Sequence, residues 1–339
     1  MNRRLPWGKL ALMALAGLLL FWVFRNISPN QVLRTLRVLD GRDLLLLALV
    51  NAVVFISFGI RWWLLLCALD QRVPFWRLLL YRLTSFAISY FTPGPHFGGE
   101  PYQVYATTQW HNVPTGRAIA AVALDKLLEM LVNFALLTAG VILLLGTRLG
   151  LAKGLEIQLV VSAVLLMALP VGLMIAQWQG RRPLTWLVIH IWRRRRKPSW
   201  FRPLRQSEDQ ASYIWREHPR IVALALLATL VSLGGMVLEF WLLASVLELP
   251  LPFLDVLSAF VVVRIAILLP MPAGLGALEA GLAMAMVSLG LDPSAGVSMA
   301  LVIRARDVLL GVSGLAVGGV HVFERAAAGE KSVERVDFE

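Results

Sequence analysis

The chain is poor in cysteine and in charge. Cys67 is the only cysteine among 339 residues, and it lies inside an apolar run. One thiol cannot form an internal disulfide, a CxxC redox pair or a thiolate metal site, so these chemistries are excluded. We interpret Cys67 as a small packed hydrophobic residue. Charged residues make up 16% of the chain, well below the fraction of about 25% that is usual in soluble domains.

Apolar residues are abundant in the chain and form long runs. They make up 58% of the chain, and the mean hydropathy is +0.71. Several runs reach about 20 residues, the length that crosses a bilayer core of about 30 Å. The apolar run at the N-terminus is followed by no small-x-small cleavage site, so we interpret it as an uncleaved first helix. The composition therefore predicts an all-α polytopic membrane protein with a single transmembrane domain over residues 1–339.

About six full transmembrane helices are expected from these runs. They are predicted at residues 7–24, 44–69, 118–146, 157–178, 220–247 and 295–320. Two further segments, 75–112 and 253–290, each have two short apolar arms separated by a break rich in proline and glycine. Because neither arm is long enough to cross, we predict two re-entrant helical hairpins that dip to mid-membrane and return.

The two interrupted segments share their landmarks at a constant offset of 179 residues. The landmarks of the first are Pro93, Glu100, Pro114 and Asp125, and those of the second are Pro272, Glu279, Pro293 and Arg304. Equal spacing of four landmarks indicates duplication of a span–hairpin–span unit. We predict repeat 1 over residues 44–146 and repeat 2 over residues 220–320, with 157–178 as a linking span.

Basic residues predict the orientation in the membrane. Residues 181–220 hold eleven of the 32 lysines and arginines but three acids, so we expect 179–219 to be a basic cytoplasmic loop. Attraction to anionic lipid headgroups is a second role for this charge, and no nucleic-acid binding is expected. Within it, "PLTWLVIHIW" is expected at the membrane interface as a short amphipathic piece. Both termini, including the tail at 321–339, then lie in the cytoplasm, although four arginines in 25–43 point the other way.

With this topology the second hairpin enters from the face opposite to the first, so the two repeats are inverted. Inverted repeats with broken helices that meet at mid-membrane are the recurring plan of secondary transporters. The small residues of "GVSGLAVGG", at 311–319, are typical of closely packed transmembrane helices.

Ionisable residues inside the predicted spans and hairpins are the candidate transport residues. Each costs several kcal/mol at the bilayer centre unless it is paired or hydrated. The candidates are Arg61, Glu100, Asp125, Lys126, Glu129, Glu239, Arg264, Glu279, Arg304 and Asp307. In the alternative interpretation these groups neutralise one another as structural pairs, Arg61 with Glu239 or Asp125 with Arg304.

The hairpin tips are the second candidate element. The helix that starts after each break, near Gly98 or Gly276, points its first N–H groups towards mid-membrane, where they can bind phosphate or carboxylate. Glycine lets backbone approach a headgroup closely. The tip residues are Pro93, Gly94, Gly98, Gly99, Pro272, Gly274 and Gly276. A glutamate in the first turn also suits the helix dipole without any ligand.

Catalytic motifs are missing from the sequence. His96 and His111 are 15 residues apart without HExxH, which gives no metal-ligand spacing. "GLGALEAG" follows no strand and is neither GxGxxG nor a GKS/T loop, and no GxSxG occurs. We therefore expect no enzyme activity, no metal and no cofactor.

The two Pro-Gly stretches are similar to the signatures of a known family. "TPGPHFGGE" and "LPMPAGLGALEAG" resemble the paired signatures of the lysylphosphatidylglycerol synthase transmembrane region, a flippase-like family, over roughly residues 5–320. "LDK" at 124–126 is similar to the family's Leu-Asp-Arg, and Arg304 is similar to its last intramembrane arginine. Gln103, Lys126 and Ala273 depart from the family pattern, and these departures concern the headgroup that is recognised. A soluble aminoacyltransferase domain is not expected after the last span, so synthesis of the lipid is not expected either.

The resemblance implies movement of lipids between leaflets. We expect a flippase or scramblase that acts without ATP on an anionic phospholipid, an aminoacylated lipid or a polyprenyl- or glycolipid-linked carrier. The alternative is a non-transporting accessory protein that binds such a lipid for an envelope-synthesis enzyme. Membrane lipids are the expected partners, with a lipid-synthesis enzyme or a second copy of the chain as further possibilities. The expected location is the inner (cytoplasmic) membrane.

Overall fold

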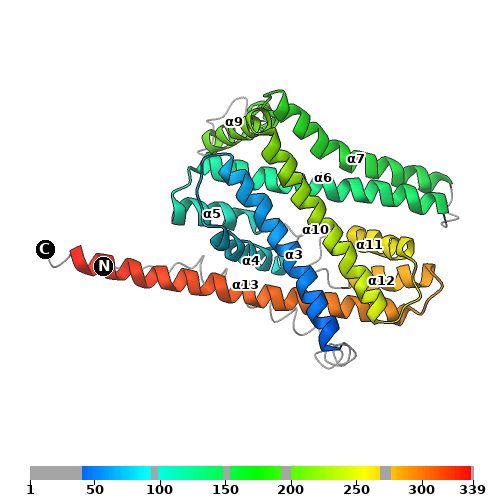
Figure 1. The fold of residues 1–339 in the computed structure, drawn as a ribbon. Helices are drawn as coiled ribbons and strands as arrows, with labels where there is room; N and C mark the ends of the chain where they lie inside the picture. The colour runs from blue at the N-terminus through cyan, green and yellow to red at the C-terminus, as the bar shows by residue number, and fades with distance from the viewer. Residues whose placement is uncertain (1–39, 93–97, 148–152, 192–199, 268–275, 337–339) are drawn as a thin grey trace.

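The computed structural model describes residues 40–92, 98–147, 153–191, 200–267 and 276–336 (Figure 1). These residues form eleven helices, α3 to α13, and contain no strand. The all-helical fold class is therefore confirmed. The predicted span at 7–24, His96 and the tip residues Pro93, Gly94, Pro272 and Gly274 lie outside the described residues.

The helices follow one another along the chain, which Figure 1 colours from blue to red. They are α3 (Gly41–Cys67), α4 (Phe75–Phe91), α5 (Glu100–His111), α6 (Thr115–Thr147), α7 (Lys153–Trp178), α8 (Pro183–Ile191), α9 (Phe201–Glu217), α10 (Pro219–Val246), α11 (Phe253–Ile267), α12 (Ala277–Ser288) and α13 (Pro293–Val336).

Among the described residues, three helices are long and apolar enough to cross a membrane. They are α3, the Val160–Trp178 part of α7, and α10, which match the spans predicted at 44–69, 157–178 and 220–247. The span predicted at 118–146 coincides with α6, and the one at 295–320 lies within α13. These two helices are long enough to cross, but both carry several charges within their predicted spans. α13 continues past the predicted end at 320 as far as Val336.

The interrupted segments are pairs of short helices, as predicted. α4 and α5 lie within residues 75–112, and α11 and α12 lie within residues 253–290. α5 and α12 have 12 residues each, which gives about 18 Å at 1.5 Å per residue. The arms of the first pair run antiparallel, because Gln103 Nε2 donates to Ser85 Oγ (2.8 Å) while the earlier Gly99 N–H donates to the later Ser89 Oγ (2.9 Å).

The long helices α3 and α10 pack side by side and antiparallel at the centre of the molecule (Figure 1). Asn51 Nδ2 donates to Glu239 Oε1 (2.9 Å), and Arg61 lies beside Thr229, so residue numbers rise on α3 as they fall on α10. Around this pair, α4 packs along α13 and α11 packs against α6. Each of these pairs joins an arm of one predicted hairpin to the long helix of the other predicted repeat.

Glycines allow α4 and α13 to approach closely. A Cβ atom added at Gly314 would lie 2.3 Å from the Leu83 carbonyl oxygen, and one at Gly318 would lie 2.5 Å from Thr84 Cγ2. Both distances are far below van der Waals contact, so the backbones can meet only because side chains are missing. The close packing predicted from the small residues of 311–319 is confirmed at these positions.

The basic segment 179–219 is mostly helical rather than irregular. α9 buries Ala211 and Ile214 in the core that α3, α6 and α10 share. The Glu208 carboxylate accepts hydrogen bonds from the Leu184 N–H (2.7 Å) and the Thr185 N–H (2.9 Å), and so caps the first turn of α8. α8 exposes a row of large apolar side chains, which are Leu184, Trp186, Leu187, Ile189 and Ile191.

Candidate functional site

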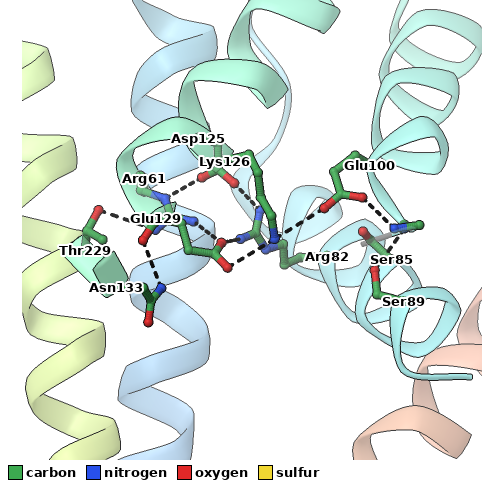
Figure 2. A network of polar contacts seen from close by, with 12 residues as sticks. Arg61, Arg82, Ser85, Ser89, Glu100, Asp125, Lys126, Glu129, Asn133 and Thr229 are labelled. Carbon is green, nitrogen blue, oxygen red and sulfur yellow. Dashed lines mark hydrogen bonds and ion pairs between the residues drawn. The ribbon is translucent and has the colours of Figure 1, made fainter. Parts of the chain in front are cut away.

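Six charged side chains from α3, α4, α5 and α6 meet in one network (Figure 2). We call it the first ion cluster, and its members are Arg61, Arg82, Glu100, Asp125, Lys126 and Glu129. The Asp125 carboxylate bridges two guanidinium groups, with Arg61 Nε 2.5 Å from Oδ1 and an Arg82 nitrogen 2.5 Å from Oδ2. α6 supplies three members because Asp125, Lys126 and Glu129 lie within about one helical turn.

Glu129 is the second bridging carboxylate of this cluster. It lies 3.0 Å from Arg61, 3.5 Å from Arg82 and 3.2 Å from Lys126. Three cations thus face three carboxylates, so the cluster carries no formal net charge. The Arg61 side chain is 0% exposed and that of Asp125 is 3% exposed. Charges at this depth are stable only when partners satisfy them, and this arrangement provides those partners.

The first hairpin tip touches the cluster through Glu100. One oxygen of its carboxylate lies 3.4 Å from Lys126 Nζ, and the other accepts a hydrogen bond from the Gly98 N–H (2.8 Å). Lys126 lies eleven residues after the start of α6 at Thr115, which is about 16 Å along the helix axis. The tip therefore lies about half a bilayer core along α6 from its first residue.

Five further charged side chains from α10, α12 and α13 form two ion-paired groups, which we call together the second ion cluster. One group is Glu279 with Arg304, and the other is Glu239, Arg306 and Asp307. Arg306 pairs with Glu239 and lies 2.8 Å from Asp307, and it also reaches Asn51 Oδ1 on α3 (3.3 Å). Arg304, whose side chain is 2% exposed, lies 2.7 Å from Glu279.

The second hairpin tip is held in the same way as the first. Glu279 accepts a hydrogen bond from the Gly276 N–H (3.0 Å) and pairs with Arg304. Arg304 lies eleven residues after the start of α13 at Pro293, again about 16 Å along the axis. Gly276 has φ +81°, a conformation that favours glycine. The glutamate of each tip thus satisfies backbone of its own tip, which supports the dipole interpretation of these two residues.

The partners of the candidate charges differ from those predicted. Arg61 pairs with Asp125 and Glu129 rather than with Glu239, and Arg304 pairs with Glu279 rather than with Asp125. Both predicted pairs are therefore wrong. The reason is the level at which the helices cross. α3 meets Asp125 of α6 at Arg61, whereas α3 meets Glu239 of α10 ten residues earlier, at Asn51.

Sequence reasoning missed two members of the clusters. Arg82 lies in the first arm of the first hairpin, and Arg306 lies between two candidates on α13. The signal was present in both cases, because an arginine in an apolar membrane segment needs a partner. The same criterion selects Arg264.

Arg264 belongs to neither ion cluster. Its guanidinium lies 4.8 Å from the centre of the Phe260 ring and contacts the Met236 sulfur. It forms no ion pair with a carboxylate in the part of the chain that the structure describes, and its buried Nε has no hydrogen-bond partner there. Arg264 and Glu129 line a cavity of about 30 Å³ between α3, α6, α10 and α11, which is room for about one or two water molecules.

Within the described residues, no group of three or more histidine, cysteine, aspartate and glutamate side chains is arranged to hold a metal ion. His111 instead lies 3.0 Å from the hydroxyl of Tyr81. Gln103, one of the departures from the family pattern, is buried beneath the first tip and donates to Ser85.

The apolar helices and the buried ion clusters define a multi-pass helical membrane protein. The family described as "Lysylphosphatidylglycerol synthase TM region" matches residues 8–314. The chain belongs to this family, which confirms the resemblance and links the protein to membrane lipid or envelope biosynthesis or transport. It is also similar to a UPF0104 membrane protein of Methanothermobacter thermautotrophicus, with 28% identity over 175 residues. That match covers 50% of this chain and 48% of the relative, so it spans about half the length of each.

Proposed function

We propose that the protein moves a phospholipid, an aminoacylated lipid or a polyprenyl- or glycolipid-linked carrier between leaflets without ATP. The observation that carries the proposal is the position of the first ion cluster. Six charges that balance one another lie at the hairpin tip, about 16 Å along α6. Such a cluster provides polar contacts at the depth where a headgroup would otherwise cross hydrocarbon.

The packing of the helices supports the proposed inverted repeat. α3 and α10 are equivalent under the offset of 179 residues, and they run antiparallel. The contacts α4–α13 and α6–α11 are likewise equivalent to each other under this offset. A twofold relation in the membrane plane would account for all three contacts, and the two hairpins would then enter from opposite faces as re-entrant elements.

The tip contacts suggest how a headgroup would be received. The carboxylate of Glu100 now occupies a position between the Gly98 N–H and the Lys126 ammonium. A headgroup phosphate offers the same negative oxygens, so it would compete with Glu100 for the backbone N–H group and for the lysine. In this proposal the glutamate fills the site when lipid is absent and moves aside when lipid arrives. No bond in the lipid is made or broken, so we propose a transporter rather than an enzyme.

Leaflet-resolved lipid movement in vesicles tests the function. Vesicles that contain only this protein and a fluorescent phosphatidylglycerol are treated with an impermeant quencher, and the protected fraction is followed with time. We expect wild type to reduce the protected fraction and Lys126→Gln to slow this loss. Asp209→Asn, which changes an exposed ion pair on α9, serves as control and should behave as wild type. Vesicles with wild-type protein that keep the protected fraction of protein-free vesicles would refute transport and favour the accessory, lipid-binding role.

Thiol labelling tests the inverted topology separately. Pro101 and Ala280 are equivalent under the repeat, and both are exposed at the start of the second arm. In a Cys67→Ala background, Pro101→Cys should be labelled by an impermeant thiol reagent from the cytoplasmic face and Ala280→Cys from the opposite face of an inner membrane. Labelling of both positions from one face would contradict the inverted repeat.

A further inference from the structure

An apolar groove runs along the membrane-facing side of α10 and α11. It has a volume of about 540 Å³, and its lining residues are Leu230, Leu233, Gly234, Val237, Leu238, Trp241, Phe253 and Leu257. The volume lies within the range of about 300–1,000 Å³ that is usual for ligand sites. Because α10 is apolar enough to cross a membrane, we expect this outer face of the helix to meet lipid chains.

Gly234 keeps the groove open. A Cβ atom built at this position would find no other heavy atom within 4 Å, whereas one at the neighbouring Gly235 would lie 2.6 Å from a Val54 methyl group. The two glycines therefore have different roles. Gly235 lets α10 approach α3, and Gly234 leaves space on the outer side.

The groove adjoins the cavity of Arg264. Leu233 lines both spaces, so the apolar groove and the polar cavity adjoin at this side chain. Leu257 and Arg264 are seven residues apart on α11, which places them on the same face about 10 Å apart along the axis. An acyl chain in the groove and a polar group at the guanidinium are thus within reach of one molecule.

Arg264 is suited to an anion because its present contacts do not neutralise it. Its direct contacts are a thioether and an aromatic ring, and its Nε is buried without a partner among the described residues. Glu129 lines the same cavity but forms its ion pairs with Arg61, Arg82 and Lys126. A buried guanidinium is stabilised strongly by oxyanions that it can bind in a bidentate manner. Phosphate esters have this geometry.

We propose that the α10–α11 groove binds an acyl chain of a phospholipid whose phosphate is bound by Arg264. This inference rests on the proposed handling of lipid, and it adds a lateral path by which the lipid leaves the bilayer. The cavity of about 30 Å³ is too small for a phosphate group. Binding therefore requires Leu233 and Met236 to move, and the unbranched methionine side chain has the flexibility to do so.

Photolabelling tests the groove independently of transport. Purified protein in nanodiscs is labelled with phosphatidylglycerol that carries a diazirine in its acyl chain, and the modified residues are found by mass spectrometry. We expect labelling within the lining residues of α10 and α11. Gly234→Leu should reduce it about tenfold, which corresponds to about 1.4 kcal/mol. Gly172→Leu is the matched control, because Gly172 of α7 is also open but does not line the groove.

Neither substitution should impair folding, because leucine favours a helix more than glycine does and both positions have open space. If Gly234→Leu is labelled as strongly as wild type, the proposed binding of an acyl chain in the groove is overturned. Lipid movement without groove labelling would also refute this inference while leaving the proposed function intact. Groove labelling without movement would support the site and refute transport.

A second pair of probes tests Arg264. A diacylglycerol with the same diazirine chains lacks the phosphate. Arg264→Gln should reduce labelling by phosphatidylglycerol about tenfold relative to this neutral probe, and Arg264→Lys should retain most of the preference. Equal labelling by both probes in wild type would overturn the role of Arg264. Displacement of the phosphatidylglycerol probe by inorganic phosphate alone would overturn the lipid assignment and identify a site for free anions.

Discussion

Burial rather than distance should decide how much each ion pair contributes to stability. The chain offers a matched comparison for this prediction. Asp125 lies 2.5 Å from Arg61 inside the bundle, where the two side chains are 3% and 0% exposed. Asp209 lies at the same distance, 2.5 Å, from Arg182, but these side chains are 43% and 38% exposed. Asn is nearly isosteric with Asp, so Asp125→Asn and Asp209→Asn remove the charge with little change of shape.

The expected loss is large for the buried aspartate. Removing one partner of a buried ion pair costs about 3–5 kcal/mol, because the other charge stays buried. Glu129 remains within 3.0 Å of Arg61 and 3.5 Å of Arg82, so we expect the low end, about 3 kcal/mol. For Asp209→Asn we expect less than about 1 kcal/mol, because water already solvates that pair.

Thermal unfolding of the detergent-solubilised protein, followed by circular dichroism, measures the difference. A loss of about 3 kcal/mol lowers the melting temperature by about 4 °C in a domain of this size, and a loss below about 1 kcal/mol by about 1.5 °C or less. Equal shifts for the two variants would refute the reasoning. So would an unchanged melting temperature for Asp125→Asn, since the first ion cluster would then not depend on its charge balance.

Two further predictions concern close packing of the backbone. Gly314→Ala should lower the stability by about 1–3 kcal/mol, because its Cβ would lie 2.3 Å from the Leu83 carbonyl oxygen, whereas Gly319→Ala, which has open space, should not. Melting temperatures of the two variants check this, and equal values would contradict the close approach of α4 and α13. Gly99→Ala should be more disruptive than either, because its Cβ would lie 2.0 Å from the Ser85 carbonyl oxygen. Its yield of monodisperse protein in size-exclusion chromatography should fall, and a wild-type yield would contradict the tip geometry.

Helix boundaries could be predicted from the sequence because their signals are local. Proline and glycine interrupt helices wherever they cluster, and the breaks near 93–99 and 268–276 lie between helices as expected. The basic segment 179–219 was harder, since its charge suggested a loop. Its helical signal was the apolar spacing of residues such as Ala211 and Ile214, which α9 buries.

The partners of the charges could not be predicted, because they depend on where distant helices cross. The sequence states that Arg61 needs a partner, but every carboxylate in a neighbouring span is a candidate. The choice of Asp125, 64 residues away, follows from the level at which α3 meets α6. A shift of one helical turn is about 5.4 Å, which is enough to exchange one ion pair for another. Apolar periodicity does not determine the crossing level to that accuracy.

The two proposed repeats hold their hairpin tips through the same kind of contact. In both halves a glutamate of the second arm binds a glycine N–H and a cation eleven residues into the next long helix. Because this arrangement occurs twice, it accounts for the attachment of a hairpin to its own repeat and requires no ligand.

Position 264, by contrast, differs between the two proposed repeats. Its equivalent under the offset of 179 residues is Ser85, which is buried, hydrogen-bonded to Gln103 and packed against Gly99 of the first tip. The fold thus accepts a small neutral side chain at this place in one half, where the other half carries a guanidinium that pairs with no described carboxylate. A buried cation without an ion partner costs free energy that the serine avoids. The serine shows that the fold does not require an arginine at this place, which agrees with the proposed role of Arg264 in binding a lipid phosphate from outside the chain.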